Sequence, residues 1–229
     1  ISLEDNNLSV NEKNLYIIMI TVLAGFALAG VVEQGVFSSL KGFLELQIHP
    51  ARLLNDYTLA GGEGAALLNA SLVGLIGLVL VKLNRIRLSG PTVAAVFTMM
   101  GFGLFGKTTV NILPIILGVY ISAKTISKSF REYILIALFG TALGPMVTLV
   151  MFEIGLSGSD GLSAGVAAGI IIGIFLPSLA IGMLHLHQGY NLYNLGMTCG
   201  FLALFAAAVF AAAGYNLPLG TLWNSEPSL

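Results

Sequence analysis

Charged residues are scarce in this chain. They make up 9% of its 229 residues, whereas hydrophobic residues make up 56% and the mean hydropathy is +0.92. Soluble domains carry roughly 25% charged residues, so this composition excludes an ordinary soluble domain and indicates an integral membrane protein in contact with lipids. The formal net charge is −1, which offers no basic surface to a nucleic acid and argues against such a partner.

Cysteine is almost absent, and Cys199 is the only one. A single cysteine excludes an intrachain disulfide, a cysteine-based zinc cluster and an iron–sulfur site built by this chain alone. The chain also lacks a Walker motif, a dinucleotide-binding fingerprint, a zinc-protease motif and a Ser/His/Asp arrangement. We therefore expect no enzyme, no cofactor and no metal. An intramembrane enzyme would need two converging catalytic groups, and Glu63 with His187 is the pair to test.

Five apolar runs are long enough to cross a membrane, and they lie at 15–32, 65–81, 133–152, 162–184 and 191–213. A hydrocarbon core about 30 Å thick needs about 20 residues of helix at about 1.5 Å per residue. The runs predict an all-α, polytopic transmembrane helix bundle. Glycines at every fourth position between Gly161 and Gly169 favour tight helix packing within it.

Two further apolar runs, 91–105 and 108–123, are too short for ordinary spans. At about 15 residues each they reach about 22 Å as helices, and a polar turn at Lys107 separates them. They predict a re-entrant pair or two short tilted spans. The segment 36–48 mixes a lysine and a glutamate with apolar residues, and is either an interfacial helix or a short polar-lined span.

Basic residues gather in two loops, one with Lys82, Arg85 and Arg87 and the other with Lys124, Lys128 and Arg131. The positive-inside rule places both loops in the cytoplasm. The segment 90–123 between them must then cross the membrane an even number of times or not at all. A re-entrant pair satisfies this condition.

Two polar stretches, 60–69 and 185–194, resemble each other. Gly64 and Asn69 correspond to Gly189 and Asn194 at a constant offset of 125 residues. In lipid, polar side chains and unwound backbone are tolerated where they are buried in protein or line an aqueous path. A duplicated broken helix therefore predicts a solute site in a transporter or channel.

The repeat divides the chain into a polar segment 1–14, a first transmembrane repeat 15–128 and a second, incomplete repeat 129–229. If 36–48 crosses the membrane, the first repeat makes an odd number of crossings and the two copies are inverted. If 36–48 only lies at the surface, this argument fails. The second copy lacks a counterpart of 90–123, so we expect a longer protein, a completing partner chain or a homo-oligomer.

The candidate substrate or pore residues are the ionisable, amide and tyrosine side chains beside these breaks. They are Glu63, Asn69, Lys107, Asn111, His187, Gln188, Tyr190, Asn191 and Asn194. A carboxylate such as Glu63 is costly in hydrocarbon, so it serves a cation, proton or polar-solute site, or it is an interfacial carboxylate, alone or paired with Arg52. Asn69 and Asn194 suit either solute recognition or hydrogen bonds between helices.

His185 and His187 could bind a metal if the backbone were extended, but no nearby Cys or Asp completes such a site. Hydrogen bonding to a solute, a proton relay, or an aromatic and histidine belt at the interface are the other interpretations. Lys107 and the N-terminus of the following helix, with free N–H groups, would attract an anion or the oxygens of a polar solute. The alternative is a short outer loop with Lys107 in water.

Three motifs carry a family resemblance: Asp56-Tyr57 … Gly61-Gly62-Glu63-Gly64-Ala65-Ala66 … Asn69, then Gly101-Phe102 … Phe105-Gly106-Lys107 … Asn111 … Pro114, then His187-Gln188-Gly189-Tyr190-Asn191-Leu192-Tyr193-Asn194. With them the chain resembles a family of bacterial polytopic membrane proteins, a domain of unknown function numbered 1576, over most of 15–213. The resemblance implies a multi-pass protein of the bacterial inner (cytoplasmic) membrane and implies no substrate. More distantly, the architecture is similar to inverted-repeat urea and small-solute channels, a likeness that transfers no function.

These observations favour a channel or transporter for a small polar solute or ion, with the path between two pseudo-symmetric repeats. Amide, hydroxyl and backbone groups would replace water around the solute. The rival is a non-transporting subunit or scaffold of a larger assembly. Polar groups that are all used in hydrogen bonds between helices would favour the scaffold.

Overall fold

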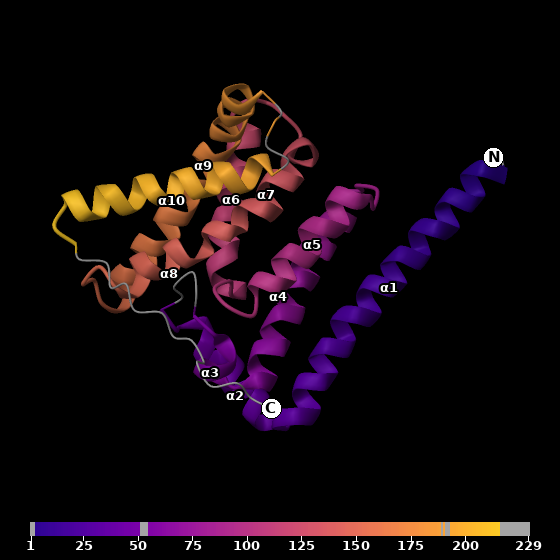
Figure 1. The fold of residues 1–229 in the computed structure, drawn as a ribbon, viewed down its shortest axis with the longest axis horizontal. Coiled ribbons are helices and arrows are strands. Elements are labelled where there is room, and N and C mark those ends of the chain that lie inside the picture. The colour runs from indigo at the N-terminus through magenta and orange to yellow at the C-terminus, as the bar shows by residue number, and fades with distance from the viewer. Residues whose placement is uncertain (1–2, 51–54, 189, 191–192, 216–229) are drawn as a thin grey trace.

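The computed structural model describes residues 3–50, 55–188, 190 and 193–215, and all its regular elements are helical (Figure 1). The first half contains α1 (Leu3–Gln34), α2 (Val36–Gln47), α3 (Tyr57–Gly61), α4 (Glu63–Leu83), α5 (Gly90–Phe102) and α6 (Thr109–Thr125). The second half contains η1 (Phe130–Tyr133), α7 (Ile134–Gly140), η2 (Thr141–Leu143), α8 (Gly144–Phe152), α9 (Gly158–His187) and α10 (Asn194–Ala212).

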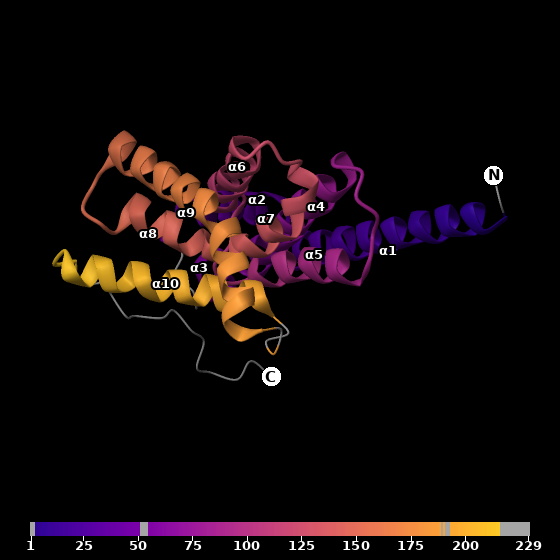
Figure 2. The ribbon, with the colours of Figure 1, turned by 90° about the horizontal axis from the view of Figure 1, so that it is seen from above.

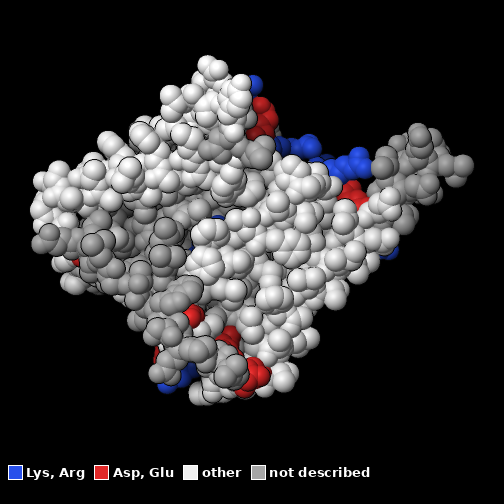
Figure 3. Space-filling model, viewed as in Figure 1, with Lys and Arg blue, Asp and Glu red and all other residues white. Residues whose placement is uncertain are grey.

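Five segments of the described chain are long and apolar enough to cross a membrane: Asn11–Gln34, Glu63–Leu83, Phe130–Phe152, Gly158–His187 and Asn194–Ala212. They coincide with the five expected spans, which confirms the prediction of an all-α, multi-pass membrane protein. Figure 3 shows most of the charged residues of one face near its upper and lower ends, with a broad uncharged belt between them. Such a belt suits the hydrocarbon core of a bilayer.

Helices α1 and α4 form an antiparallel pair. A methyl group on Gly30 would lie 2.8 Å from the carbonyl oxygen of Gly64, so the two helices touch backbone to backbone at the lower end in Figure 1. At the upper end, the Lys82 ammonium lies 5.8 Å from the centre of the Tyr16 ring. Glycines with positive φ lie at the lower ends of both helices, since Gly35 (84°) follows α1 and Gly62 (90°) precedes α4.

Helices α5 and α6 form a hairpin that starts and ends at the same end of the molecule, the arrangement that the re-entrant alternative predicts, and we call it a re-entrant pair. Helix α5 returns antiparallel along α4, and a methyl group on Gly103 at its end would lie 2.6 Å from the Cα of Ala70. Helix α6 then runs back to the upper end, where Arg131 Nη2 donates to the carbonyl oxygen of Arg85 at 3.0 Å. The two helices contain 13 and 17 residues, about 20 and 26 Å. Their connecting turn, 103–108, which we call the tip, therefore lies inside the molecule.

A second re-entrant pair, α2 and α3, comes from the opposite end. Helix α2 begins directly after Gly35, and at its last residue Gln47 Nε2 donates to Oδ1 of Asn69 at 3.2 Å. Helix α3 starts beside the tip, where the Tyr57 N–H donates to the Leu104 carbonyl at 3.0 Å, and leads back to the start of α4. Helix α2 therefore leads from the lower end of the molecule toward the tip, and α3 leads back. The two interpretations of 36–48 in the membrane stay predictions.

The inverted repeat is not shown by this fold. Tyr16 lies beside Lys82, and the Arg131–Arg85 hydrogen bond holds the start of η1 at the same end. The starts of α1 and of η1 therefore lie at the same end of the molecule. The inverted repeat stays a prediction.

The second half packs on α6. Helix α9 runs parallel to α6, with Gly173 against the carbonyl oxygen of Ile115 and Gly169 against Pro114. Gly161 and Gly165 of the expected glycine stripe contact α8, which confirms that the stripe packs tightly. Helix α10 lies across the outside of this layer (Figures 1 and 2).

Candidate functional site

Asn69, fully buried in α4, joins the two re-entrant pairs. Its Nδ2 group donates to the carbonyl oxygens of Gly103 (2.6 Å) and Lys107 (2.8 Å), and its Oδ1 accepts from Gln47. Tip carbonyls lack the partners that a continuous helix would give them, so a side chain must satisfy them away from water. The contacts of Asn69 are those of a bridge between helices.

Gln47 completes this bridge, and sequence reasoning missed it. Its Nε2 also donates to the Phe43 carbonyl at 3.0 Å, while its Oε1 accepts from Thr109 Oγ1 at 2.7 Å and from the Val110 N–H at 3.4 Å. The side chain thus connects α2 to both α4 and the start of α6. In the sequence, the one signal that points to Gln47 is its position in 36–48, an amphipathic segment whose depth in the membrane the sequence leaves open.

Asn111 organises the tip from the other side. Its Oδ1 accepts from the Thr108 N–H at 2.9 Å, its Nδ2 donates to the Gly106 carbonyl at 2.9 Å, and its own N–H donates to Thr108 Oγ1 at 3.2 Å. With the Val110 N–H bound to Gln47, three N–H groups at the start of α6 are occupied. The expectation that free N–H groups would point at a solute is therefore wrong for these three.

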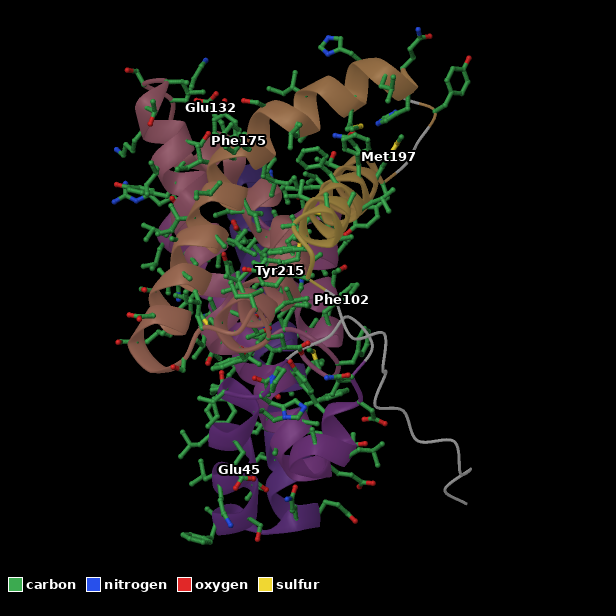
Figure 4. The ribbon with its side chains drawn as sticks, turned by 90° about the vertical axis from the view of Figure 1, so that its left-hand side faces the viewer. Glu45, Phe102, Glu132, Phe175, Met197 and Tyr215 are labelled. Carbon is green, nitrogen blue, oxygen red and sulfur yellow. The ribbon has the colours of Figure 1, made fainter. Side chains whose placement is uncertain are left out.

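Lys107 is fully buried, so the interpretation as a solvated outer loop is wrong. Its Nζ atom has no hydrogen-bond partner among the described residues and lies 4.9 Å from the centre of the Phe102 ring. The Cys199 thiol of α10 interacts electrostatically with Lys107. Figure 4 shows Phe102, the last residue of α5, at a height between Glu132 at one end of the molecule and Glu45 toward the other. The buried side chains of Lys107 and Thr108 place the tip in the interior.

A second polar atom beside the tip is also uncommitted. The Tyr57 hydroxyl is buried without a partner, and within the described residues only Lys107 Nζ shares this property among side-chain nitrogen and oxygen atoms. The Tyr57 backbone is bound to Leu104 of the tip. Unpaired buried polar atoms are rare in proteins, so two at one junction mark it as unusual.

The second polar stretch forms a separate cluster at the end of α9. Written with the proton on Nε2, His187 donates to Asn194 Oδ1 at 2.7 Å, and Asn194 Nδ2 donates to the Ala180 carbonyl at 3.0 Å. The His185 ring contacts the Ile181 carbonyl instead, so the two histidines have different partners. Within the described ranges, no three His, Cys, Asp or Glu side chains are grouped as metal ligands.

The remaining candidates lie outside both clusters. Glu63 is exposed at the first position of α4, six residues or about 9 Å before Asn69 and at the end opposite His187. The structure therefore does not bring Glu63 and His187 together as a catalytic pair. Gln188 is exposed and ends α9 with φ 50°, Tyr190 is 92% exposed, and Asn191 lies outside the described residues.

The structure thus unites Asn69, Lys107 and Asn111 at the tip, joins His187 to Asn194 elsewhere, and leaves Glu63 apart. At the tip the side-chain amides of Gln47, Asn69 and Asn111 are engaged in hydrogen bonds, which stabilise an irregular backbone in the interior. Lys107 adds an amino group with unused hydrogen-bond donors, whose charged form is disfavoured by burial. The arrangement can therefore hold a rigid turn and offer hydrogen bonds to an acceptor.

Two large grooves are apolar, and neither is lined by a residue of the tip. One of about 630 Å³ runs between α8, α9 and α10, with Phe175, Phe201 and Phe205 in its walls. The other, of about 590 Å³, includes Pro114, Tyr120 and Phe130. Their linings suit lipid chains or another apolar helix and offer no polar recognition.

Comparison with known proteins matches residues 35–212 to a family model described as a protein of unknown function, DUF1576. Neither the curated proteins nor the solved structures contain a match, so the likeness to urea channels stays a prediction. The matched region holds both re-entrant pairs and the tip residues. By this match over most of its length, the chain belongs to the DUF1576 family of proteins of unknown function.

Proposed function

We propose that this protein is a channel or transporter for a small polar solute or ion in the bacterial inner membrane. The observation that carries the proposal is the meeting, inside the molecule, of two re-entrant pairs that enter from opposite ends. Broken helices that meet at membrane depth are how many transporters build a solute site. Irregular backbone there is tolerated when it is buried in protein or lines an aqueous path.

Lys107 separates this proposal from its rival. The engaged amides of Gln47, Asn69 and Asn111 would serve a scaffold equally well, because they join helices. A scaffold has no use for a buried ammonium without a partner, since burial disfavours a charge and leaves its hydrogen bonds unmade. A solute that accepts hydrogen bonds supplies a reason for Lys107. We therefore place the solute path beside the tip rather than between inverted repeats.

The charged loops and the exposed apolar helices support a multi-pass orientation in the membrane and leave faces free for a partner. The basic loops at the upper end would lie in the cytoplasm by the positive-inside rule. Only 11% of the α10 span and 17% of the α1 span are buried inside the molecule, so both offer apolar faces to lipid, to a second copy or to a completing chain. Lipids, an oligomer partner and the solute are thus the proposed partners.

The test is solute flux in proteoliposomes made with the purified protein. Urea, glycerol, sodium acetate and potassium chloride cover neutral, anionic and cationic solutes, and empty liposomes give the background. We expect the protein to carry at least one solute faster than background, and Lys107→Met to lose this flux. If none of the solutes crosses faster than in empty liposomes, the transport proposal is wrong and the scaffold is preferred.

A further inference from the structure

We infer that the solute is a small anion, held by Lys107 between the tip and α10. This inference rests on the proposed transport function. It concerns the class of solute, which transport alone leaves open. The class of solute depends on which polar groups at the junction still have unused hydrogen-bond donors or acceptors.

The side-chain amides at the tip have few unused hydrogen-bond donors or acceptors. Asn69 donates to two carbonyls and accepts from Gln47, whose own amide binds four groups. Asn111 uses its oxygen and one donor within the tip. A cation needs oxygen ligands, and the amide oxygens here are already accepting hydrogen bonds. The junction is therefore poorly suited to a cation.

Lys107 is the exception, because an ammonium group has three N–H donors and accepts nothing. Its Nζ atom is fully shielded from solvent and unpaired. Within the described residues no carboxylate lies in ion-pair range of it, since the described ion pairs are Lys41–Glu45 and Lys128–Glu132 at the surface. The Phe102 ring offers a weak cation–π contact, which does not neutralise the charge. An anion beside Nζ would stabilise the charged ammonium that burial otherwise disfavours, so this lysine matches one negative charge on a solute.

Helix α10 covers this lysine. Thr198 and Cys199 are the buried residues of α10 in the described chain, while its other residues are half-buried or exposed. Helix α10 packs against η2, which leads into Gly144 and its contact with Asn111, and Cys199 interacts electrostatically with Lys107, so this short buried stretch faces the tip. An anion held at Nζ would lie against the contact between the tip and α10 and would shield the Cys199 thiol. This thiol is the only one of the chain, which makes it a native probe of whether the site is occupied.

The experiment combines anion flux with the rate at which N-ethylmaleimide labels Cys199. Acetate, chloride and nitrate are compared with urea and glycerol at constant ionic strength. Lys107→Met removes the charge with little change in volume, and Lys128→Met, at an exposed surface pair, is the matched control. We expect anions to cross and to slow labelling of the native protein. Lys107→Met should lower anion flux about thirtyfold or more and abolish the protection, because a buried charge loses its partner. Lys128→Met should behave like the native protein.

The other outcomes separate the two proposals. Flux of urea or glycerol without anion flux or anion protection would overturn the anion inference and leave the transport function standing. Protection of Cys199 by anions in the native protein alone, without flux, would support the anion site and overturn transport. Absence of both flux and protection would overturn both. A cooperative thermal transition of Lys107→Met, no lower than that of the native protein, would show that a loss of flux is not a loss of folding.

Discussion

Replacing Asn69 with alanine tests whether the bridge between the re-entrant pairs holds the fold together. The change removes hydrogen bonds to Gly103, Lys107 and Gln47 and leaves two carbonyls and an amide N–H without partners. In soluble proteins an unsatisfied buried group costs about 1–3 kcal/mol. In membrane proteins such bonds average about 0.6 kcal/mol each. Combining the two scales, we expect a loss of about 2–4 kcal/mol in the free energy of unfolding.

For a chain of this size, each kcal/mol shifts the unfolding midpoint by about 2–4 °C, so Asn69→Ala should lower it by about 4–16 °C. Circular dichroism of the purified protein in detergent measures this midpoint from the loss of helix. The matched control is Asn84→Ala on the same helix, because the Asn84 side chain donates to the Leu80 carbonyl within its own helix end. The control should shift the midpoint by less than about 2 °C.

A double-mutant cycle sharpens the test. Because Gln47 donates to Asn69, the two alanine substitutions share one interaction, and their effects should fall short of additivity by about 0.5–2 kcal/mol. Midpoints for Asn69→Ala and Asn84→Ala that agree within error would refute the bridging role. Fully additive effects would show that the hydrogen bond between the two amides contributes nothing.

Three further predictions concern the tip and the topology. Tyr57→Phe should raise the free energy of unfolding by about 1 kcal/mol, measured by the same melting curves, because it removes a buried hydroxyl without a partner. Gly144→Ala should lower it by about 1–3 kcal/mol, because the new methyl group would lie 2.6 Å from Oδ1 of Asn111 and displace the tip. In a cysteine-free background, Ser129→Cys should be labelled by an impermeant maleimide only from the cytoplasmic side, and Asp160→Cys only from the other side.

Each of these predictions has a contrary outcome. A lower midpoint for Tyr57→Phe would mean that its hydroxyl has a partner in the membrane. Gly101→Ala is the control for Gly144→Ala, since a methyl group there meets no atom within 4 Å and should leave the helix as stable or more stable. Equal effects of the two alanines would contradict the close packing of α8 against the tip. Labelling of both cysteines from one side would contradict the topology.

The spans were predictable because length and hydropathy alone determine whether a helix can cross a bilayer. The tip was predictable for the same reason: two runs too short to span, with Lys107 between them, leave few other arrangements. The break before α4 also follows from sequence, since Gly62 adopts a φ of 90° that other residues rarely accept. These features depend on neighbours along the chain.

What sequence could not supply depends on contacts between distant residues. Gln47 meets Thr109, 62 positions later, and nothing local marks it among the polar residues of its helix. Thr108 and Asn111 close a cap that occupies N–H groups expected to be free. The inverted repeat depended on whether 36–48 crosses the membrane, and composition cannot tell a short span from a helix that enters and returns. Glu63 and Asn69 differ in environment because one turn and a half of helix separates an exposed end from the interior.

The tip has a consequence for how the chain is made. A ribosome delivers the protein from its N-terminus, so α2 and α4, with Gln47 and Asn69, leave the translocon before α5 and α6. Alone, two helices of about 20 and 26 Å with unpaired carbonyls between them have no reason to enter the bilayer. Asn69, which donates hydrogen bonds to those carbonyls, has already been synthesised when the pair leaves the ribosome. The order of synthesis therefore agrees with the order in which these contacts can form.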